Sequence, residues 1–472
     1  MLFLIIITAF ILRVISLNQS LWLDEAINIL ATQKYSLLGI ITEYAKGDFH
    51  PPGYFIVIWI WAKLFGTNEI VVRIPSVIFG LLTVYIIYLI GQKLHSKRLG
   101  LISALLLAIN PLHVYYSQEA RMYSLATLVV SINILLLLKI IKGEKLNLIL
   151  LIISNVGVLM SDYLTYFIFP AQFILLLFLK QKEILKKWFI AFICAVLFSI
   201  WWLPIFITQL SVGSVAASDL PTWKFVVGAF DIKTPILTFV KFIIGRISLS
   251  DKLLYEIILL PVVALFLFLI WRGIKTIPTL GKYLLIIWIL VPIILATVIS
   301  FIIPIFSYFR MLFILPAFII LTSLGITPFK SKPRKALLIT IVLVQLFSTS
   351  IYLFNSSFHR ENWRGLVNFL KTQDKTSLIL FESSGTLPPF DYYAKDNLNA
   401  KGGLKDFPAK SEADLADIQN FSINSKDIYL VNYIVEISDP QRLIDKRLKT
   451  LGYKISETKD FRGVGFLYHY VK

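Results

Sequence analysis

The sequence predicts an all-α polytopic membrane protein, with about eleven transmembrane helices and further interfacial helices on the outer side, followed by a small C-terminal α/β domain. Two properties of the 472 residues lead to this class: 57% are hydrophobic and only 16% are charged. Water-soluble proteins have roughly a quarter of their residues charged, so a chain of this composition needs the bilayer as part of its solvent. A cytosolic enzyme, a secreted disulfide scaffold and a disordered protein are excluded. The single cysteine, Cys194, cannot form an internal disulfide.

The formal net charge of +18 is concentrated in the membrane part of the chain. Residues 355–472 hold 17 Lys and Arg and 15 Asp and Glu, which leaves 29 and 13 for residues 1–354. The balanced tail is typical of a soluble domain, whereas excess positive charge in a membrane protein marks its cytoplasmic loops. We therefore expect a transmembrane domain over 1–354 and a soluble domain over 355–472, with no nucleic-acid partner.

Eleven apolar stretches approach the roughly 20 residues that a spanning helix needs. The first is not interpreted as a cleaved signal peptide, because it lacks a basic region at its start. Two further stretches, about 53–66 and 236–248, are apolar but short. The eleven predicted spans are about 1–17, 72–94, 99–113, 121–141, 147–161, 163–180, 188–207, 253–271, 282–303, 308–327 and 334–354.

The distribution of basic residues predicts the orientation of these spans. If both short stretches stay on the outer side as interfacial or re-entrant helices, the short loops of one face hold 17 Lys and Arg and only two acids, Glu144 and Glu183. Such loops face the cytoplasm, which places the N-terminus inside and residues 355–472 outside. In the alternative, 53–66 spans the membrane, and the basic clusters are scattered over both faces.

The tail has the pattern of a small α/β domain. Two segments have a helical pattern, about 361–371 and 440–451. Four apolar or β-rich segments predict strands, at about 377–381, 428–433, 453–458 and 463–471.

A pair of acids follows the first predicted span. Asp24 and Glu25 come directly after Trp22 and Leu23, at a membrane interface where partial desolvation raises a carboxylate pKa and favours a general base. In the alternative interpretation the two acids only begin an amphipathic helix, where the helix dipole favours them.

Other ionisable residues fall on the same predicted face. His50 lies beside Asp48 and before two prolines, which leave it on a rigid corner, and histidine suits acid–base or phosphate contacts. Glu119 and Arg121 lie at the outer junction of two spans, where charges are expensive unless paired or functional. Either pair can be purely structural.

Two arginines complete the set. Arg73 and Arg310 begin spans on the outer side; both can snorkel, but both lie where an anionic headgroup meets the protein. Carboxylates, a histidine and cations on one face are what chemistry on a lipid-linked phosphate requires, because cations stabilise the leaving group and a carboxylate accepts a proton.

In this order the motifs resemble the dolichyl-phosphate-mannose–protein mannosyltransferase superfamily, in its bacterial and archaeal branch, within the GT-C class of integral-membrane glycosyltransferases. The resemblance covers about residues 1–330. Its motifs are Trp-Leu-Asp-Glu at 22–25, His-Pro-Pro at 50–52, Arg-Ile-Pro-Ser at 73–76, Tyr-Ser-Gln-Glu-Ala-Arg-Met-Tyr at 116–123, Tyr-Phe-Arg at 308–310 and Pro316.

The resemblance implies a role for each candidate residue. Asp24 matches the catalytic base, Glu25 its partner, and Glu119 lies with Arg121 in the second active-site segment. The donor phosphate is expected to be bound by His50, Arg73, Arg121 and Arg310. Residues 1–354 are then the catalytic domain, which transfers a sugar from a polyprenyl-phosphate donor to an acceptor, with inversion, at the outer face of the cell membrane.

The resemblance leaves several points open. The acceptor can be a glycan, a lipid or a protein, and no cofactor is implied beyond a divalent metal ion, for which Asp24, Glu25 and Glu119 are the available carboxylates. Two alternatives remain: a ligase that moves an oligosaccharide from a lipid pyrophosphate, and a non-enzymatic transporter of lipid or polysaccharide. A transporter predicts charges near mid-bilayer and repeated halves, whereas here the charges cluster at the ends of the spans.

Overall fold

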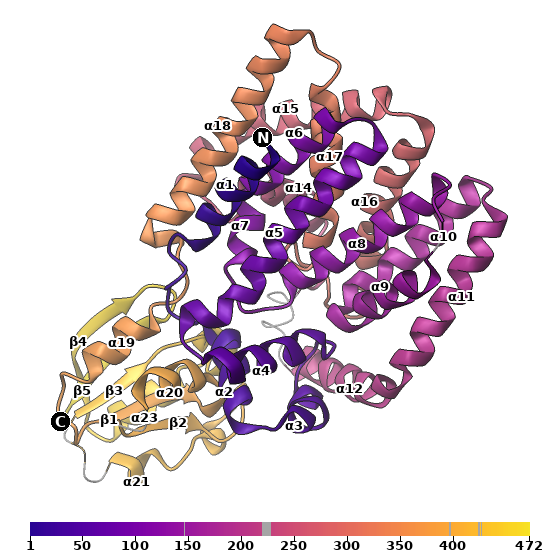
Figure 1. Ribbon diagram of the computed structural model, residues 1–472. Coiled ribbons are helices and arrows are strands. Elements are labelled where there is room, and N and C mark those ends of the chain that lie inside the picture. Colours follow the sequence, from indigo (N-terminus) through magenta and orange to yellow (C-terminus); the bar gives the residue numbers. More distant parts are fainter. Residues whose placement is uncertain (146, 220–227, 396–397, 423–424, 426) are drawn as a thin grey trace. The chain divides into compact units, whose positions relative to one another are not determined.

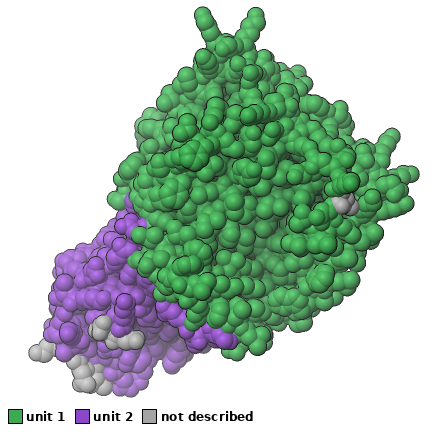
Figure 2. Space-filling model, viewed as in Figure 1, with its two compact units in different colours: residues 1–17, 37–214, 227–358 green, residues 18–36, 215–226, 359–472 purple. Residues whose placement is uncertain are grey.

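The computed structural model describes residues 1–472 except 146, 220–227, 396–397, 423–424 and 426. The chain forms two compact units (Figure 2). The first comprises 1–17, 37–214 and 227–358; the second comprises 18–36 and 359–472, with a short segment that begins at Val215. The division into functional domains at 354/355 stays a prediction, and the compact units differ from it because residues 18–36 pack with the C-terminal part.

The first unit consists of apolar helices (Figure 1). In the described residues, six runs are long and apolar enough to cross a membrane: α5 (Glu69–Leu94), α8 (Tyr123–Ile141), α11 (Lys182–Ser199) continuing into α12 (Leu203–Asp219), α15 (Lys252–Thr276), α16 (Thr279–Ile299) and α18 (Ser331–Phe354). A seventh is the pair α6 (Lys97–Ala108) and α7 (Pro111–Ser117), bent by 63°.

Shorter apolar helices fill the remaining predicted positions. They are α1 (Leu2–Val14), α4 (Gly53–Phe65), α9 (Leu148–Ser161), α10 (Ile168–Phe178), α14 (Thr234–Ile244) and α17 (Leu315–Ile326). Each of the eleven predicted stretches therefore contains an apolar helix, and the two short stretches, 53–66 and 236–248, correspond to α4 and α14. The all-α membrane fold is confirmed, while the number of eleven spans stays a prediction.

Side-chain caps and a proline determine where the central helices begin and bend. The Asn68 side chain accepts the Val71 N–H at the start of α5, and Asn110 accepts the His113 N–H at the start of α7. Pro111 at the first turn of α7 has no N–H to donate, which suits the first turn of a new helix. The bend between α6 and α7 therefore has a local cause, and it leads the chain into residues 118–122.

The α5–α6 contact depends on two glycines. A Cβ on Gly91 of α5 would lie 2.8 Å from the Gly100 Cα of α6, a distance at which backbone must move. The absence of side chains at both positions lets the two helices approach closely, and α5 also packs along α8 (Figure 1).

The C-terminal part of the second unit is an α/β domain with a five-stranded sheet. Its strands are β1 (Leu378–Ser383), β2 (Ala400–Leu404), β3 (Asp427–Val431), β4 (Lys454–Phe461) and β5 (Gly465–Val471), in the order β2-β1-β3-β5-β4. The first three are parallel, with Leu378 opposite Ile428, and β5 is antiparallel to both β3 and β4.

Helices cover both faces of this sheet. On one face, α19 (Trp363–Leu370) and α20 (Pro388–Ala394) pack on the Ile379 and Phe381 side chains of β1. On the other, α21 (Ile418–Ser422) and α23 (Leu443–Thr450) pack on Leu378 and Leu380. The short α22 (Val435–Ser438) follows β3. The predicted α/β class is confirmed, with β2 and α20–α22 as elements that the sequence did not indicate.

Candidate active site

The predicted acidic pair lies at the start of a helix. Helix α2 (Leu23–Lys34) begins at Leu23, so Asp24 and Glu25 occupy its first turn, where the helix dipole favours negative charge. Glu25 is fully buried, and its Oε2 accepts the Trp22 backbone N–H at 3.4 Å. Asp24 is partly exposed. Glu25 therefore contributes to the helix cap.

Residues before α2 are hydrogen-bonded to the C-terminal part of the same unit. The Gln19 Oε1 accepts the Arg360 N–H at 3.0 Å, and the Ser20 Oγ accepts the Arg364 N–H at 3.0 Å. The Leu21 N–H donates to the Tyr393 hydroxyl at 2.9 Å. These contacts fix the backbone that carries Asp24.

A third carboxyl, Glu361, holds the first turn of α2. Its Oε2 accepts the Leu23 N–H at 3.3 Å and the Trp363 Nε1–H at 2.6 Å, and its Oε1 accepts the Tyr433 hydroxyl at 2.8 Å. Burial raises the pKa of Glu361 to about 7; the three hydrogen bonds lower it and the nearby charge of Asp24 raises it. The Glu361 carboxyl therefore carries a proton for part of the time at neutral pH, beside Asp24.

Glu361 was not among the predicted site residues. The signal available in the sequence was its position: an acid next to a tryptophan directly after the last predicted span, as Asp24 and Trp22 follow the first. The contact with Leu23 joins residues 338 positions apart, which no local pattern indicates.

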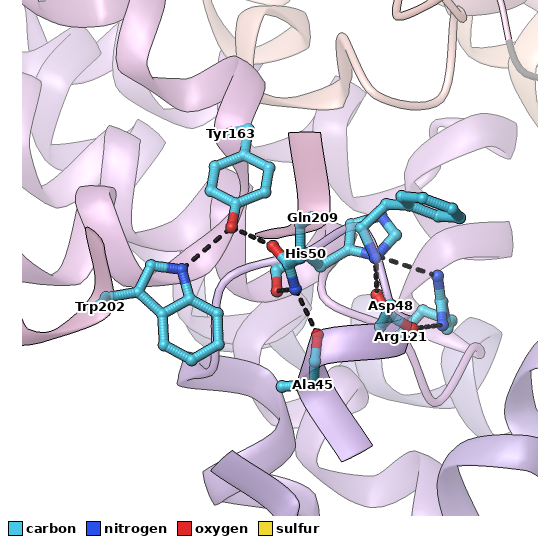
Figure 3. A network of polar contacts seen from close by, with 8 residues as sticks. Ala45, Asp48, His50, Arg121, Tyr163, Trp202 and Gln209 are labelled. Atoms are coloured by element: carbon cyan, nitrogen blue, oxygen red, sulfur yellow. Dashed lines mark hydrogen bonds and ion pairs between the residues drawn. The ribbon is translucent and has the colours of Figure 1, made fainter. Parts of the chain in front are cut away.

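In the first unit, His50 and Arg121 are brought together with Asp48 (Figure 3). The His50 Nδ1 lies 2.5 Å from the Asp48 Oδ1, and the Arg121 Nη1 lies 4.0 Å from the Asp48 Oδ2. Burial raises the pKa of Asp48, but the His50 imidazole and the Arg121 guanidinium together hold it at about 2. The carboxylate is thus ionised and balanced by neighbouring positive charge.

The proton on His50 can be assigned from these distances. The Arg121 Nη2 lies 3.5 Å from the same Nδ1 atom, and Nδ1 cannot both donate to Asp48 and accept from Arg121. The shorter contact assigns the proton to Nδ1. The His50 Nε2 is buried and has no hydrogen-bond partner among the described residues.

A polar chain fixes the backbone around His50. The Gln209 Nε2–H donates to the Ala45 and His50 carbonyl oxygens, at 2.5 and 3.2 Å, and the Gln209 Oε1 accepts the Tyr163 hydroxyl. The Trp202 Nε1–H donates to the same hydroxyl at 2.9 Å (Figure 3). Helix α12 and residue 163 therefore determine where the His50 loop lies.

The other predicted residues have separate surroundings in the first unit. Arg73 on α5 is fully buried, and its Nη1 donates to the Leu17 carbonyl at 2.8 Å. Glu119 is buried in the turn between α7 and α8, two residues before Arg121. Arg310 is partly exposed, and its Nη1 donates to the Ile305 carbonyl at 3.4 Å.

Two short contacts relate these residues to one another. One turn along α5 from Arg73, the Ser76 hydroxyl lies 3.5 Å from the Arg121 carbonyl oxygen. Phe309, next to Arg310, packs on Tyr123 with ring centroids 5.4 Å apart. Residues 121–123 are thus the common neighbours of the α5 and 308–310 segments.

Across the described part of the chain, no group of three or more His, Cys, Asp or Glu side chains is arranged to hold a metal ion. The Asp48 carboxylate is already paired with His50 and Arg121.

The fold resembles the GT-C fold of solved integral-membrane glycosyltransferases. The structure of ArnT from Cupriavidus metallidurans bound to undecaprenyl phosphate matches 99% of this chain and 97% of that one, with a TM-score of 0.62 and 11% identity. The Archaeoglobus fulgidus oligosaccharyltransferase AglB, in complex with an inhibitory peptide and a dolichol-phosphate, matches over 91% of this chain and 69% of that one, with a TM-score of 0.52 and 13% identity.

Sequence comparison agrees with the predicted resemblance. The family model of dolichyl-phosphate-mannose-protein mannosyltransferase matches residues 49–204, a range that includes His50, Arg73, Glu119 and Arg121. An uncharacterized protein of Aquifex aeolicus is 27% identical over 194 residues, which is 39% of this chain and 38% of that protein.

Proposed function

We propose that this protein is a membrane glycosyltransferase that moves a sugar from a polyprenyl-phosphate donor to an acceptor at the outer face of the membrane. The observation that carries the proposal is the match over nearly the whole of both chains to a structure that holds undecaprenyl phosphate. The family model over residues 49–204 supports the same donor class.

The proposed reaction is a single displacement with inversion. The acceptor hydroxyl oxygen attacks the anomeric carbon, the bond from that carbon to the phosphate oxygen breaks, and polyprenyl phosphate leaves with the bonding electrons. Asp24 accepts the hydroxyl proton as general base. Its partial exposure suits this role, with Glu25 as its structural partner and Glu119 as the carboxyl of the second segment.

The proposed contacts to the donor phosphate come from His50, Arg73, Arg121 and Arg310. Charge-assisted hydrogen bonds to phosphate are about twice as strong as neutral ones, and they strengthen as negative charge develops on the leaving group. The His50 Nε2 has no partner in the described structure. When the imidazole carries both protons, the Nδ1–H remains hydrogen-bonded to Asp48, and the Nε2–H can donate to a phosphate oxygen.

A direct assay tests the proposal. The purified protein is incubated with polyprenyl-phosphate sugars labelled in the sugar and with glycan, lipid and peptide acceptors. We expect the label to move to one acceptor class and polyprenyl phosphate to be released, with Asp24→Asn as the inactive control. Release of polyprenyl pyrophosphate from a pyrophosphate-linked donor instead identifies the oligosaccharide ligase, and movement of intact donor across vesicles without sugar transfer identifies a transporter.

The proposed orientation has its own test. Cysteines at Ser96 and Ser331 are expected to be shielded from a membrane-impermeant thiol reagent in intact cells, whereas a cysteine at Ser357 is expected to react. The prediction follows from the basic loops around the first two positions. Labelling at Ser96 contradicts it, because residues 53–66 must then span the membrane.

A further inference from the structure

A cavity of about 230 Å³ lies in the C-terminal α/β domain, at the carboxyl ends of two adjacent parallel strands. Glu382 lies near the end of β1, and Asn432 directly follows β3. Both line the cavity. None of the residues given a role in sugar transfer does so.

The position has a topological meaning. After β1 the chain passes to α20 on one face of the sheet, whereas after β3 it passes through α22 to α23 on the other. The connections therefore diverge between β1 and β3, and in open α/β sheets ligands bind in the crevice at such a switch point.

Two buried polar atoms in this crevice have no partner among the described residues. They are the Glu382 Oε2 and the Asn432 Oδ1, on side chains that are 2% and 8% exposed. Buried polar atoms are nearly always hydrogen-bonded in folded proteins. Because both residues line the same small space, a ligand with several hydrogen-bonding groups can satisfy both.

The charges around the cavity are balanced. Burial, together with the charges of Asp439 and Asp445, raises the pKa of Glu382 to about 8, although Arg442 opposes this. At neutral pH the Glu382 carboxyl is thus a neutral donor. Asp439 and Asp445 are offset by Arg442 and Lys449, which also line the cavity.

The acids of the cavity wall are also committed to the protein. The two Asp439 oxygens accept the Leu443 and Ile444 N–H groups, each at 2.9 Å. Asp445 accepts from Lys449 at 2.7 Å and from the Tyr470 hydroxyl. A bound cation would gain little from carboxylates that are already hydrogen-bonded in this way. A bound anion would be attracted by the two cations but repelled by the two acids, so the site favours neither charge.

The remaining wall is apolar. Leu430 and Ile455 line it together with the Tyr468 side chain. The volume is below the roughly 300–1,000 Å³ of sites for drug-sized ligands. A single neutral ring with an apolar face and several hydroxyl groups matches the volume, the lack of net charge and the polar atoms together.

We infer that the C-terminal domain has a carbohydrate-binding site at the β1–β3 switch point, which takes one neutral sugar ring of a glycan. Glu382 and Asn432 bind its hydroxyl groups, and Lys449 and Arg442 bind its outer edge. The site does not depend on the proposed sugar transfer, since binding requires neither the donor nor the general base.

The test measures binding without catalysis. The full-length protein in detergent is titrated with methyl glycosides of mannose, glucose, galactose and arabinose, with inorganic phosphate and Ca²⁺ as charged probes, and binding is followed by saturation-transfer NMR and calorimetry. We expect at least one glycoside to bind more tightly than either ion. Failure of every glycoside to bind, or preferential binding of phosphate or Ca²⁺, overturns the inference.

Variants locate the binding. Lys449→Ala is expected to weaken glycoside binding at least tenfold, whereas Lys446→Ala, an exposed lysine on the same helix that does not line the cavity, is the matched control. Glu382→Gln is also expected to weaken glycoside binding, and thermal unfolding checks that this variant folds. If it does not fold, the affinity of Lys449→Ala, which changes a largely exposed side chain, alone tests the inference. Unchanged affinity in Lys449→Ala shows that the sugar binds elsewhere and overturns the inference. A protein that binds glycosides in this way but transfers no sugar contradicts only the proposed function.

Discussion

Two polar clusters, one in each compact unit, use carboxyl groups in opposite ways. In the first unit, Asp48 is paired with His50 and Arg121, and its pKa is held at about 2. In the second, burial raises the pKa of Glu361 to about 7, with neutral donors as its hydrogen-bond partners and Asp24 as a neighbouring acid. The first cluster holds fixed charge, which suits binding an anion; in the second, Glu361 titrates near neutral pH.

The largest expected effect concerns the titratable cluster. Asp24→Asn keeps the shape of the side chain but removes its basicity, so turnover is expected to fall by roughly 10²-fold or more, because a positioned base contributes about 10²–10⁴-fold. Donor binding is expected to stay nearly intact. Single-turnover kinetics measures the chemical step and donor titration measures the affinity, so the two effects can be separated.

Glu25→Gln is the matched control for this substitution. It is expected to lower turnover less than Asp24→Asn does. Glu25 is buried and accepts a backbone N–H, and the amide oxygen of glutamine can accept the same hydrogen bond. Near wild-type turnover in Asp24→Asn together with an inactive Glu119→Gln assigns the base to the second segment and contradicts the proposal.

Next in size is the pH dependence that Glu361 gives to stability. Its folded-state pKa of about 7 is above its ordinary value, so the folded protein binds this proton more tightly. The resulting stabilisation is complete below about pH 4.5 and is lost as the pH rises to 7, by about 3 kcal/mol. Glu361→Gln cannot ionise, and we expect thermal unfolding of this variant to decline less between pH 4.5 and 7. An unchanged slope shows that Glu361 is ionised throughout.

A smaller effect is expected in the charge-paired cluster. Asp48→Asn leaves Arg121 and His50 without their buried counter-charge, which is expected to lower the free energy of unfolding by about 2 kcal/mol. The pH dependence of this stabilisation is opposite to that of Glu361. The ionised Asp48 stabilises the fold above about pH 4, and this stabilisation is lost as the pH falls towards 2. Glu183→Gln, in an exposed pair with Lys186, is the control, expected to change stability by less than about 0.5 kcal/mol.

The smallest expected effect tests whether Arg73 binds the donor. Arg73→Ala is expected to weaken donor affinity by about tenfold through the loss of charge-assisted contacts. Arg73→Lys is expected to recover only part of this affinity, because the planar guanidinium, which can donate two parallel hydrogen bonds, is replaced by an ammonium point charge. Donor titration of both variants, normalised to folded protein, measures this. Wild-type affinity in Arg73→Ala means that the guanidinium has a structural role, which includes its contact with the Leu17 carbonyl.

The sequence was sufficient for the features that depend on local pattern. Long apolar runs predicted the helices of the membrane part, and the apolar segments at 377–381 and 428–433 became β1 and β3. The strand β2 was not predicted because Ala-Lys-Gly-Gly-Leu has two glycines and no β-branched residue, and it forms only by pairing with β1.

Within the candidate site, the limits of sequence reasoning are also physical. Asp48 beside His50 is evident from the spacing, but the contact with Arg121 is not, since it joins residues 71 positions apart. The chain from Trp202 through Tyr163 to Gln209 depends on the packing of helices. Glu361 was missed for the same reason, because its partners Leu23 and Tyr433 are distant in the chain.

The hydrogen bond from Leu23 to Glu361 also has a consequence for biosynthesis. The segment that carries Asp24 leaves the ribosome early, whereas the residue that receives its N–H follows 338 positions later. At about 5–20 residues per second, this interval lasts about 20–70 s. During that time residues 19–23 lack their partners Arg360, Glu361 and Arg364. A chain truncated before these residues therefore leaves the segment that carries Asp24 without these hydrogen bonds.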